Sequence, residues 1–247
     1  MNQMTNPIKL VQKGDLNSLQ TYLVAFPREE SCKIVNAPDQ HGDTLVHFSA
    51  RFHRKDILAL LIKSYGGNTM AVNEHGIYLS AASKKTKSLS STLCLAQSKS
   101  GRLPIHTAAL FNHPEVVFYF LETSNETKQF FLTSEDNGGA DLLQNAVISK
   151  NLEMTKKLIE ENSCDVNHKD KIGRSAIHHA SMIGDMSVIR LLIEFGADLN
   201  ISDDWDRWTP LHHACKEGNL EVVKYFINDC CADTSIRDKH GRDPKDV

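Results

Sequence analysis

Apolar residues occur along this chain in short, paired helical patterns. The clearest pair lies in residues 209–227, where apolar side chains recur at three- and four-residue spacing on both sides of Gly218. That spacing places the apolar side chains of a helix on one face. Thr209 is a typical N-cap, Pro210 is a typical first helical residue, and Gly218 favours the left-handed conformation that ends a helix. The segment therefore predicts one helix from Pro210 to about Glu217 and a second helix after Gly218.

The same paired pattern returns several times upstream. Each copy has a histidine, or once a glutamine, in the first turn of its first helix: His47, His106, Gln144, His178 and His212. His178 and His212 are 34 residues apart, Gln144 and His178 are also 34 apart, and His106 and Gln144 are 38 apart. One such hairpin buries too little apolar surface to be stable alone, so regular copies indicate a stack of hairpins with a continuous core.

These sequences resemble the ankyrin repeat. Thr209-Pro210-Leu211-His212 matches its T-P-L-H start, and Asp165-Val166-Asn167 and Asp198-Leu199-Asn200 match the D-V-N end of its hairpin. The resemblance implies an all-α, ankyrin-repeat solenoid of stacked helix-turn-helix hairpins with β-turn fingers, of about six repeats including an N-terminal cap and one degenerate repeat. We expect a single domain, 1–247, with repeats at approximately 6–35, 39–70, 73–98 (degenerate), 99–133, 136–167, 170–200 and 203–235 and a partial unit at 238–247.

Two segments upstream of residue 140 depart from the regular repeat. Residues 8–23 predict a capping hairpin that turns at Gly14. The connection of residues 123–139 is longer than its counterparts and contains a run of apolar residues at 130–132. We expect this run to pack under the connecting loop as additional core.

The last hairpin has only a partial successor. Asp243-Pro244 starts a helix that ends by Val247, and so short a helix is not stable alone. Terminal repeats normally need a cap with a polar outer face. We therefore expect the helix at residues 220–227 to open more readily than its counterpart at residues 186–193.

Composition and charge limit the class of protein. The chain has 247 residues, 40% hydrophobic content and a net charge of -3, which is ordinary for a folded soluble protein. No apolar run approaches the roughly 20 residues of a membrane helix, and residues 1–7 lack the features of a signal peptide. We expect a cytoplasmic and/or nuclear protein whose six cysteines, at no framework spacing, are free thiols.

A basic segment from Lys84 to Arg102 stands out because no acidic residue lies between His75 and Pro114. Its Ser/Lys-rich part, residues 83–91, favours a loop, and an anionic partner site is the alternative. Nucleic acid is not the expected partner, because the segment lacks interleaved aromatic residues for base stacking.

The sequence carries no pattern typical of catalysis, and we expect a protein that is not an enzyme. It has no phosphate-binding glycine loop, no dinucleotide-binding glycine motif and no Gly-x-Ser-x-Gly elbow. Neither Cys-x-x-Cys nor His-Glu-x-x-His occurs, so we expect no metal and no cofactor. The resemblance instead implies that His47, His106, His178 and His212 bond backbone groups of the neighbouring loop.

The resemblance also implies where a protein partner binds. In ankyrin repeats the turn tips form fingers, and the C-terminal residues of each first helix line a palm. We expect partner contacts at Phe52, Leu110, Phe111, Met182, Ile183, Arg174, Trp205 and Trp208. A strip of apolar palm residues indicates a partner groove or residues tucked under the fingers. The two tryptophans lie in a finger with one additional residue, where they anchor a partner or pack on each other.

Two further expectations come from resemblance. Residues 10–59 are similar to the start of an ankyrin-repeat protein associated with alanyl-tRNA synthetase and its proofreading. The alternative to an interaction module or scaffold is therefore a synthetase-associated cofactor in quality control, with an aminoacyl-tRNA synthetase as the partner. In ankyrin repeats the Asn of the D-V-N turn can be hydroxylated, and Asn200 follows Leu192 at the spacing that the asparaginyl hydroxylase tolerates.

For the oligomeric state, we expect a monomer.

Overall fold

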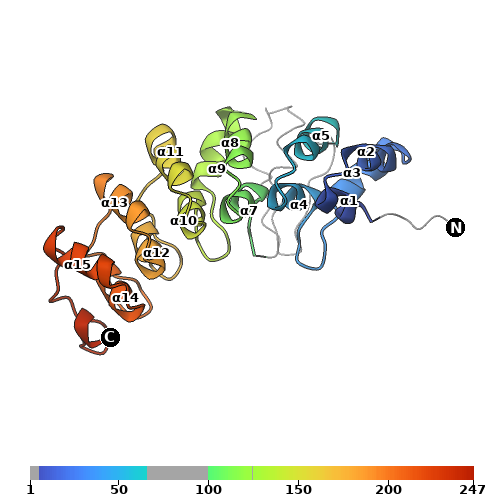
Figure 1. Ribbon diagram of the computed structural model, residues 1–247. Helices are drawn as coiled ribbons and strands as arrows, with labels where there is room; N and C mark the ends of the chain where they lie inside the picture. Colours follow the sequence, from blue (N-terminus) through green and yellow to red (C-terminus); the bar gives the residue numbers. More distant parts are fainter. Residues whose placement is uncertain (1–5, 66–99, 124) are drawn as a thin grey trace. The chain divides into compact units, whose positions relative to one another are not determined.

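The computed structural model describes residues 6–65, 100–123 and 125–247, in which every regular element is a helix. It divides into two compact units, Met1–Phe131 and Leu132–Val247, called here the N-terminal and C-terminal units. The N-terminal unit contains α1 (Pro7–Lys13), α2 (Leu16–Val24), α3 (Arg28–Asn36), α4 (Leu45–Arg51), α5 (Lys55–Tyr65), α7 (Pro104–Leu110), α8 (Pro114–Thr123) and most of α9 (Asn125–Thr133) (Figure 1). The C-terminal unit contains α10 (Leu142–Ile148), α11 (Leu152–Asn162), α12 (Ala176–Ile183), α13 (Met186–Glu194), α14 (Pro210–Lys216), α15 (Leu220–Asn228) and the short 3-10 helix η1 (Pro244–Asp246). The all-α prediction is confirmed.

The last hairpin begins and ends where its sequence predicts. Thr209 is the N-cap of α14, and its hydroxyl accepts the backbone N–H of His212 at 3.4 Å. Pro210 is the first residue of the helix, and Lys216 is the last. Gly218 then takes a φ of 71°, a left-handed conformation that costs glycine little. The chain reverses there into α15.

In the N-terminal unit, the first helices of successive hairpins form one layer. α4 packs on α1 and on α7, while α5 packs on α3 behind them. Fully buried Leu19, Leu23, Ile57, Leu61 and Phe120 contribute to the core of this unit. The hairpins α4–α5 and α7–α8 are therefore neighbours through their first helices. The predicted degenerate repeat, 73–98, lies outside the described residues.

The C-terminal unit is a regular series of three hairpins. The pairs α10–α11, α12–α13 and α14–α15 follow one another in chain order (Figure 1). α12 packs between α10 and α14, and α11 packs on α13. η1 packs on α14 and buries Pro244. The last hairpin is thus covered on its first helix by a single short turn.

The two irregular segments upstream of residue 140 are only partly as the sequence predicts. The capping hairpin is confirmed, since α1 and α2 meet at Gly14 with a φ of 76°. The helix α3 that follows was not predicted. The long connection after α8 contains the helix α9 rather than a loop alone. Its apolar run does join the core, because Phe131 and Leu132 are 1% and 8% exposed.

Buried histidines tie first helices to the next finger. Nε2 of His47 lies 2.9 Å from the carbonyl oxygen of Arg102, and Nε2 of His178 lies 3.2 Å from that of Trp208. Both imidazoles are completely buried, so an N–H donated to a carbonyl satisfies two polar groups at once. The predicted structural role is confirmed for these two histidines.

Gln144 performs the same task where the repeat has lost its histidine. Its side-chain amide donates to the carbonyl oxygens of His168 at 3.0 Å and Arg174 at 2.8 Å. In the last hairpin, burial lowers the pKa of His212, and the nearby Arg242 carbonyl opposes that shift. Among the described residues, Nε2 of His212 has no partner in hydrogen-bond geometry. This tie is therefore weaker at the end of the chain.

None of the helices in the described part of the chain is both long and apolar enough to cross a membrane.

Candidate functional site: fingers and palm

In five of the fingers, an aspartate at the base of the loop holds the loop in shape. These residues are Asp39, Asp136, Asp170, Asp203 and Asp238. In the four C-terminal fingers, Oδ1 accepts two backbone N–H groups of its own loop at 2.8–3.1 Å. Such side-chain bonds define Asx turns. Asp203 reaches the N–H groups of Asp206 and Trp208, one position further along than the others, because its finger has one additional residue.

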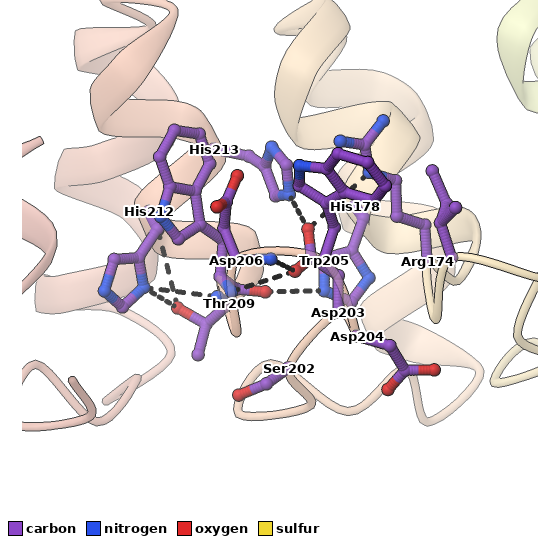
Figure 2. Close-up of polar contacts among 12 residues, drawn as sticks. Arg174, His178, Ser202, Asp203, Asp204, Trp205, Asp206, Thr209, His212 and His213 are labelled. Atoms are coloured by element: carbon purple, nitrogen blue, oxygen red, sulfur yellow. Dashed lines mark hydrogen bonds and ion pairs between the residues drawn. The ribbon is translucent and has the colours of Figure 1, made fainter. Parts of the chain in front are cut away.

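Asp203 also joins its finger to the preceding finger and to the helix α14 (Figure 2). Its Oδ2 atom lies 2.9 Å from Nε2 of His213 and 3.6 Å from Nε of Arg174. Burial alone would raise the pKa of Asp203, but the bond from His213 and two backbone N–H groups hold it well below its usual value. The ionised carboxylate therefore acts as a structural tie. The predicted partner residue Arg174 is partly buried beside it.

The structure separates the two tryptophans of the long finger. The side chain of Trp205 is 67% exposed, and Lys239 lies 5.9 Å from its ring centroid. Trp208 is half-buried, with its indole N–H donating to Asp238 at 3.3 Å and its ring packed edge-on against His213 at 5.2 Å. Trp205 therefore lies mostly exposed on the finger tip, with Lys239 as its neighbour, whereas Trp208 packs between the last two fingers and α14.

The C-terminal unit places two further predicted residues at the end of α12. Met182 and Ile183 are both half-buried. The side-chain amide of Asn219 donates to the carbonyl oxygens of Ser181 at 2.8 Å and Met182 at 3.1 Å. Asn219 of the next hairpin thus holds the C-terminal end of α12. Met182 and Ile183 lie at palm positions and are only partly exposed to solvent.

The N-terminal unit contains a hollow between fingers and palm, with a volume of about 280 Å³. Finger residues His41, Asp43, Ser100 and Arg102 and palm residues Arg51, Thr107, Leu110 and Phe111 line it. The hollow therefore combines finger and palm positions of two neighbouring hairpins, α4–α5 and α7–α8. Thr107 was not among the expected residues, although its place one helical turn before Phe111 was a signal for it.

Arg51 organises this hollow. Its Nη2 atom lies 2.8 Å from Oδ2 of Asp43, a carboxylate that is almost fully buried. Its guanidinium carbon lies 5.0 Å from the ring centroid of Phe111 and 5.8 Å from that of Phe48, within the range of cation–π contacts. Nε2 of His113 lies 2.7 Å from the Arg51 carbonyl oxygen. The residue is thus held at both its backbone and its side chain.

Two predicted aromatic residues of this unit are exposed. Phe52 and Phe111 are 36% and 45% exposed, and Leu110 is half-buried. Phe52 stacks on Phe48 at a centroid distance of 6.4 Å. The structure therefore brings Leu110 and Phe111 into the hollow, with Phe52 at the end of the preceding first helix. These residues and those of the C-terminal unit form two separately described surfaces.

Asn200 has a different contact from the one its turn position suggests. The local turn is closed by Asp198, whose Oδ1 accepts the N–H of Asn200 at 2.8 Å. The side chain of Asn200 instead reaches the following repeat and accepts the N–H of Asp233 at 2.9 Å. Asn167 has the equivalent bond, to the N–H of Asp198 at 2.9 Å. Asn200 is exposed, and its hydroxylation stays a prediction that mass spectrometry of the intact peptide tests.

The buried polar side chains described above bond to other groups of the protein. The Asp203–His213 pair resembles part of a catalytic dyad, but the two side chains are 0% and 3% exposed. A general base has to lie within hydrogen-bond reach of its substrate. Among residues 6–65, 100–123 and 125–247, no group of three or more His, Cys, Asp or Glu side chains could hold a metal ion.

The chain forms stacked helical hairpins, its fingers are closed by aspartate side chains, and buried histidines bond the backbone of a following finger. Together these features define a repeat protein of the ankyrin class. A family profile described as "Ankyrin repeats (3 copies)" matches residues 78–170 and 143–238. The chain belongs to the ankyrin-repeat family. This fold is typically a non-enzymatic module for protein–protein interaction.

Three similar proteins illustrate the range of the family. The chain is 30% identical over 133 residues to an ankyrin repeat protein of Fowlpox virus (strain NVSL), a match that covers 54% of this chain and 88% of the viral protein. It is 30% identical over 148 residues to a 26S proteasome regulatory subunit of Saccharomyces cerevisiae, covering 60% of this chain and 63% of the yeast protein. The solved ankyrin repeat domain of Bcl-3, a member of the IκB protein family, matches with a TM-score of 0.68 at 21% identity, over 97% of this chain and 92% of that domain. This last likeness shows the fold alone.

Proposed function

We propose that this protein is a non-enzymatic interaction module or scaffold that binds a protein partner through its palm surfaces and finger tips. We propose further that it acts as a monomer in the cytoplasm, the nucleus or both. The partner contacts are those of Phe52, Leu110 and Phe111 in the N-terminal unit and of Met182, Ile183, Arg174 and Trp205 in the C-terminal unit. Trp208 contributes by holding the finger that carries Trp205.

The position of the exposed apolar side chains supports this proposal. Large hydrophobic residues with open surfaces in the described chain are Val24, Phe52, Phe111, Leu152, Ile172, Trp205, Leu220 and Ile227. Half of them, namely Phe52, Phe111, Ile172 and Trp205, lie at palm or finger positions. Exposed aromatic side chains cost solubility unless a partner covers them, and tryptophan most often carries the energy of an interface.

A second candidate is a cofactor of aminoacyl-tRNA synthetase, in particular of alanyl-tRNA synthetase quality control. It rests on the resemblance of residues 10–59 to the start of ankyrin repeat domain-containing protein 16. The relatives described above give it no support. Retention of the synthetase with the purified protein favours this candidate, and a steep loss of binding with salt would indicate a contact with tRNA through the basic segment.

Affinity purification from cells tests the first proposal. The wild-type chain is compared with Phe111→Ala and Trp205→Ala, since these exposed side chains can be truncated without opening the core. We expect a defined set of proteins that both variants lose, with a loss of about 2 kcal/mol or more in the binding free energy of the direct partner. Lys63→Gln, at an exposed position of the second helix α5 that is not among the proposed contacts, is the control and should retain the set. Equal recovery by all four proteins contradicts the proposal.

A further inference from the structure

The second helices of the C-terminal unit have corresponding positions, because α11, α13 and α15 each follow directly after an Asn or Asp N-cap. At the fourth position of the helix, Ile189 of α13 is completely buried and Val223 of α15 is half-buried. At the eighth position, Ile159 of α11 is buried, Ile193 of α13 is half-buried and Ile227 of α15 is exposed. One face of the second helices is therefore covered inside the stack and open on α15.

Three apolar residues and one lysine make up the open face of α15. Leu220, Val223, Lys224 and Ile227 are spaced i, i+3, i+4 and i+7, so they lie on one side of the helix. Leu220, Lys224 and Ile227 are exposed, and Val223 is half-buried. These four residues are called here the end face. Their spacing is that of a helix side that packs against another helix.

The end of the stack has an open place beside α15 and an occupied place beside α14. Inside the unit, a first helix packs on a first helix, as α12 does on α10, and a second helix packs on a second helix, as α13 does on α11. η1 lies against α14 and buries Pro244 (Figure 1). Within the described residues, η1 thus takes the place of a further first helix, while the place of a further second helix is open. This arrangement favours a single helix over a hairpin as the occupant.

The contact between α13 and α15 indicates what this additional helix presents. The guanidinium carbon of Arg190, the fifth residue of α13, lies 4.2 Å from the ring centroid of Tyr225 in α15. Lys224 is the fifth residue of α15 and therefore corresponds to Arg190. An aromatic side chain of the additional helix, placed as Tyr225 is placed on α13, would lie beside the Lys224 ammonium in a cation–π contact.

We propose that the end face binds one amphipathic helix of a protein partner, with apolar residues at three- and four-residue spacing against Leu220, Val223 and Ile227 and an aromatic residue beside Lys224. The bound helix continues the packing that already joins the second helices of this unit. Covering Leu220 and Ile227 removes their apolar surface from water, which favours binding. The end face lies outside the palm and finger positions, so this inference goes beyond the proposed function.

The exposed residues of the end face can be changed without opening the core. Leu220→Glu places a charge on the end face, and a glutamate is favourable to a helix at its first residue. Leu152→Glu is the matched control, because Leu152 is the exposed first residue of α11 inside the stack. Lys224→Gln removes the cation of the end face. Its control is Lys156→Gln, at the fifth residue of α11.

The experiment selects binders on the full 247-residue chain from a displayed library of peptides of about 18 residues, which is long enough to form a helix. Selected peptides are synthesised, and their affinities and their helix content on binding are measured. We expect peptides that become helical, with an apolar stripe and one aromatic residue. Leu220→Glu should weaken their binding roughly tenfold or more, while Leu152→Glu should leave it unchanged.

The lysine of the end face gives a second, finer readout. Lys224→Gln should weaken binding roughly threefold, whereas Lys156→Gln should not change it. The effect of Lys224→Gln should vanish when the aromatic residue of the peptide is replaced by leucine, because the two changes remove the same contact. Hydrogen exchange of the complex should slow at residues 220–227. Circular dichroism of each variant confirms that folded proteins are compared.

The outcomes separate this inference from the proposed function. Peptides that Phe111→Ala or Trp205→Ala loses and Leu220→Glu retains bind at the palm or fingers, which overturns the inference and supports the proposed function. Peptides that need Leu220 but stay non-helical overturn the helix as the occupant. Self-association of the wild-type chain that Leu220→Glu abolishes assigns the end face to a second copy and overturns it as well. Enrichment of no peptide contradicts the inference, while the affinity purification still decides the proposed function.

Discussion

Single residues decide how closely the fingers approach one another. An added Cβ at Gly173 would lie 2.5 Å from the backbone nitrogen of Asp204 in the next finger, whereas nothing lies within 4 Å of a Cβ at Gly241. Both glycines have similar left-handed φ values, 79° and 77°. Alanine at either position would therefore have the same conformational strain. At Gly173 its Cβ would in addition clash with the backbone of Asp204.

This difference predicts unequal effects of the same substitution. Gly241→Ala should lower the free energy of unfolding by about 1–2 kcal/mol, the cost of the left-handed conformation for a residue with a Cβ. Gly173→Ala should cost roughly 1–3 kcal/mol more, because the finger of Asp204 has to move. Urea unfolding of both variants measures this. Equal losses would mean that the fingers give way easily and do not hold the stack.

At the scale of the element, the second helices differ in how well they are covered. α13 buries Val188, Ile189, Leu191 and Leu192, and α15 buries only Val222 and Phe226. Two large apolar residues of α15 are open to solvent, Leu220 at 68% and Ile227 at 43%. η1 packs on α14 and gives α15 no comparable cover. Buried apolar surface is the main source of local stability, so α15 should open at a lower cost than α13.

Hydrogen exchange of the isolated chain measures this prediction. We expect the amides of residues 220–227 to exchange at least tenfold faster than those of residues 186–193. A tenfold ratio corresponds to a difference of about 1.4 kcal/mol in the free energy of opening. A protein partner that covers α15 should slow this exchange. Equal protection of the two helices in the isolated chain would show that the last hairpin needs no further cover.

At the scale of the whole molecule, buried and half-buried histidines with lowered pKa values make the fold sensitive to acid. Burial lowers the pKa of His47, His113 and His212, and it lowers that of His178 to about 3 with a further contribution from His213. In the unfolded chain these imidazoles take up a proton near pH 6.5. The unfolded state therefore binds more protons below that pH. Stability should be complete above about pH 6.5 and should fall as the pH drops toward 3.

His178→Gln isolates one part of this effect. Gln144 shows that a glutamine amide makes the same tie to the next finger, so the variant should keep most of the stability at pH 7.5. It should also lose less stability than wild type on going to pH 4.5, by on the order of a few kcal/mol. Asp141, whose pKa burial raises to about 6, works in the opposite direction but is common to both proteins. Thermal unfolding at the two pH values measures the difference, and identical losses would contradict the role given to His178.

The repeat, the boundaries of its regular hairpins and the buried ties between them could be predicted from the sequence, whereas α3 and α9 could not. These features depend on local spacing: Thr209-Pro210 starts a helix, Gly218 ends the turn, and the histidine of the first turn recurs at a regular interval. Such local features can be recognised without knowing which distant residues are in contact, because each hairpin packs only on its neighbours.

Which side chains are open to a partner depends on contacts between residues that are distant in the sequence. Trp205 and Trp208 lie in the same finger, and the sequence gives no sign of which one is exposed. In the structure, Asp238, 30 residues after Trp208, accepts the indole N–H of Trp208, while Trp205 stays 67% exposed. The hollow around Arg51 is a second example. Asp43 and Arg102 come from two fingers and Phe111 comes from the end of α7, and only the fold brings them together. Exposure and charge at one point depend on residues far apart in the chain, and no local pattern encodes them.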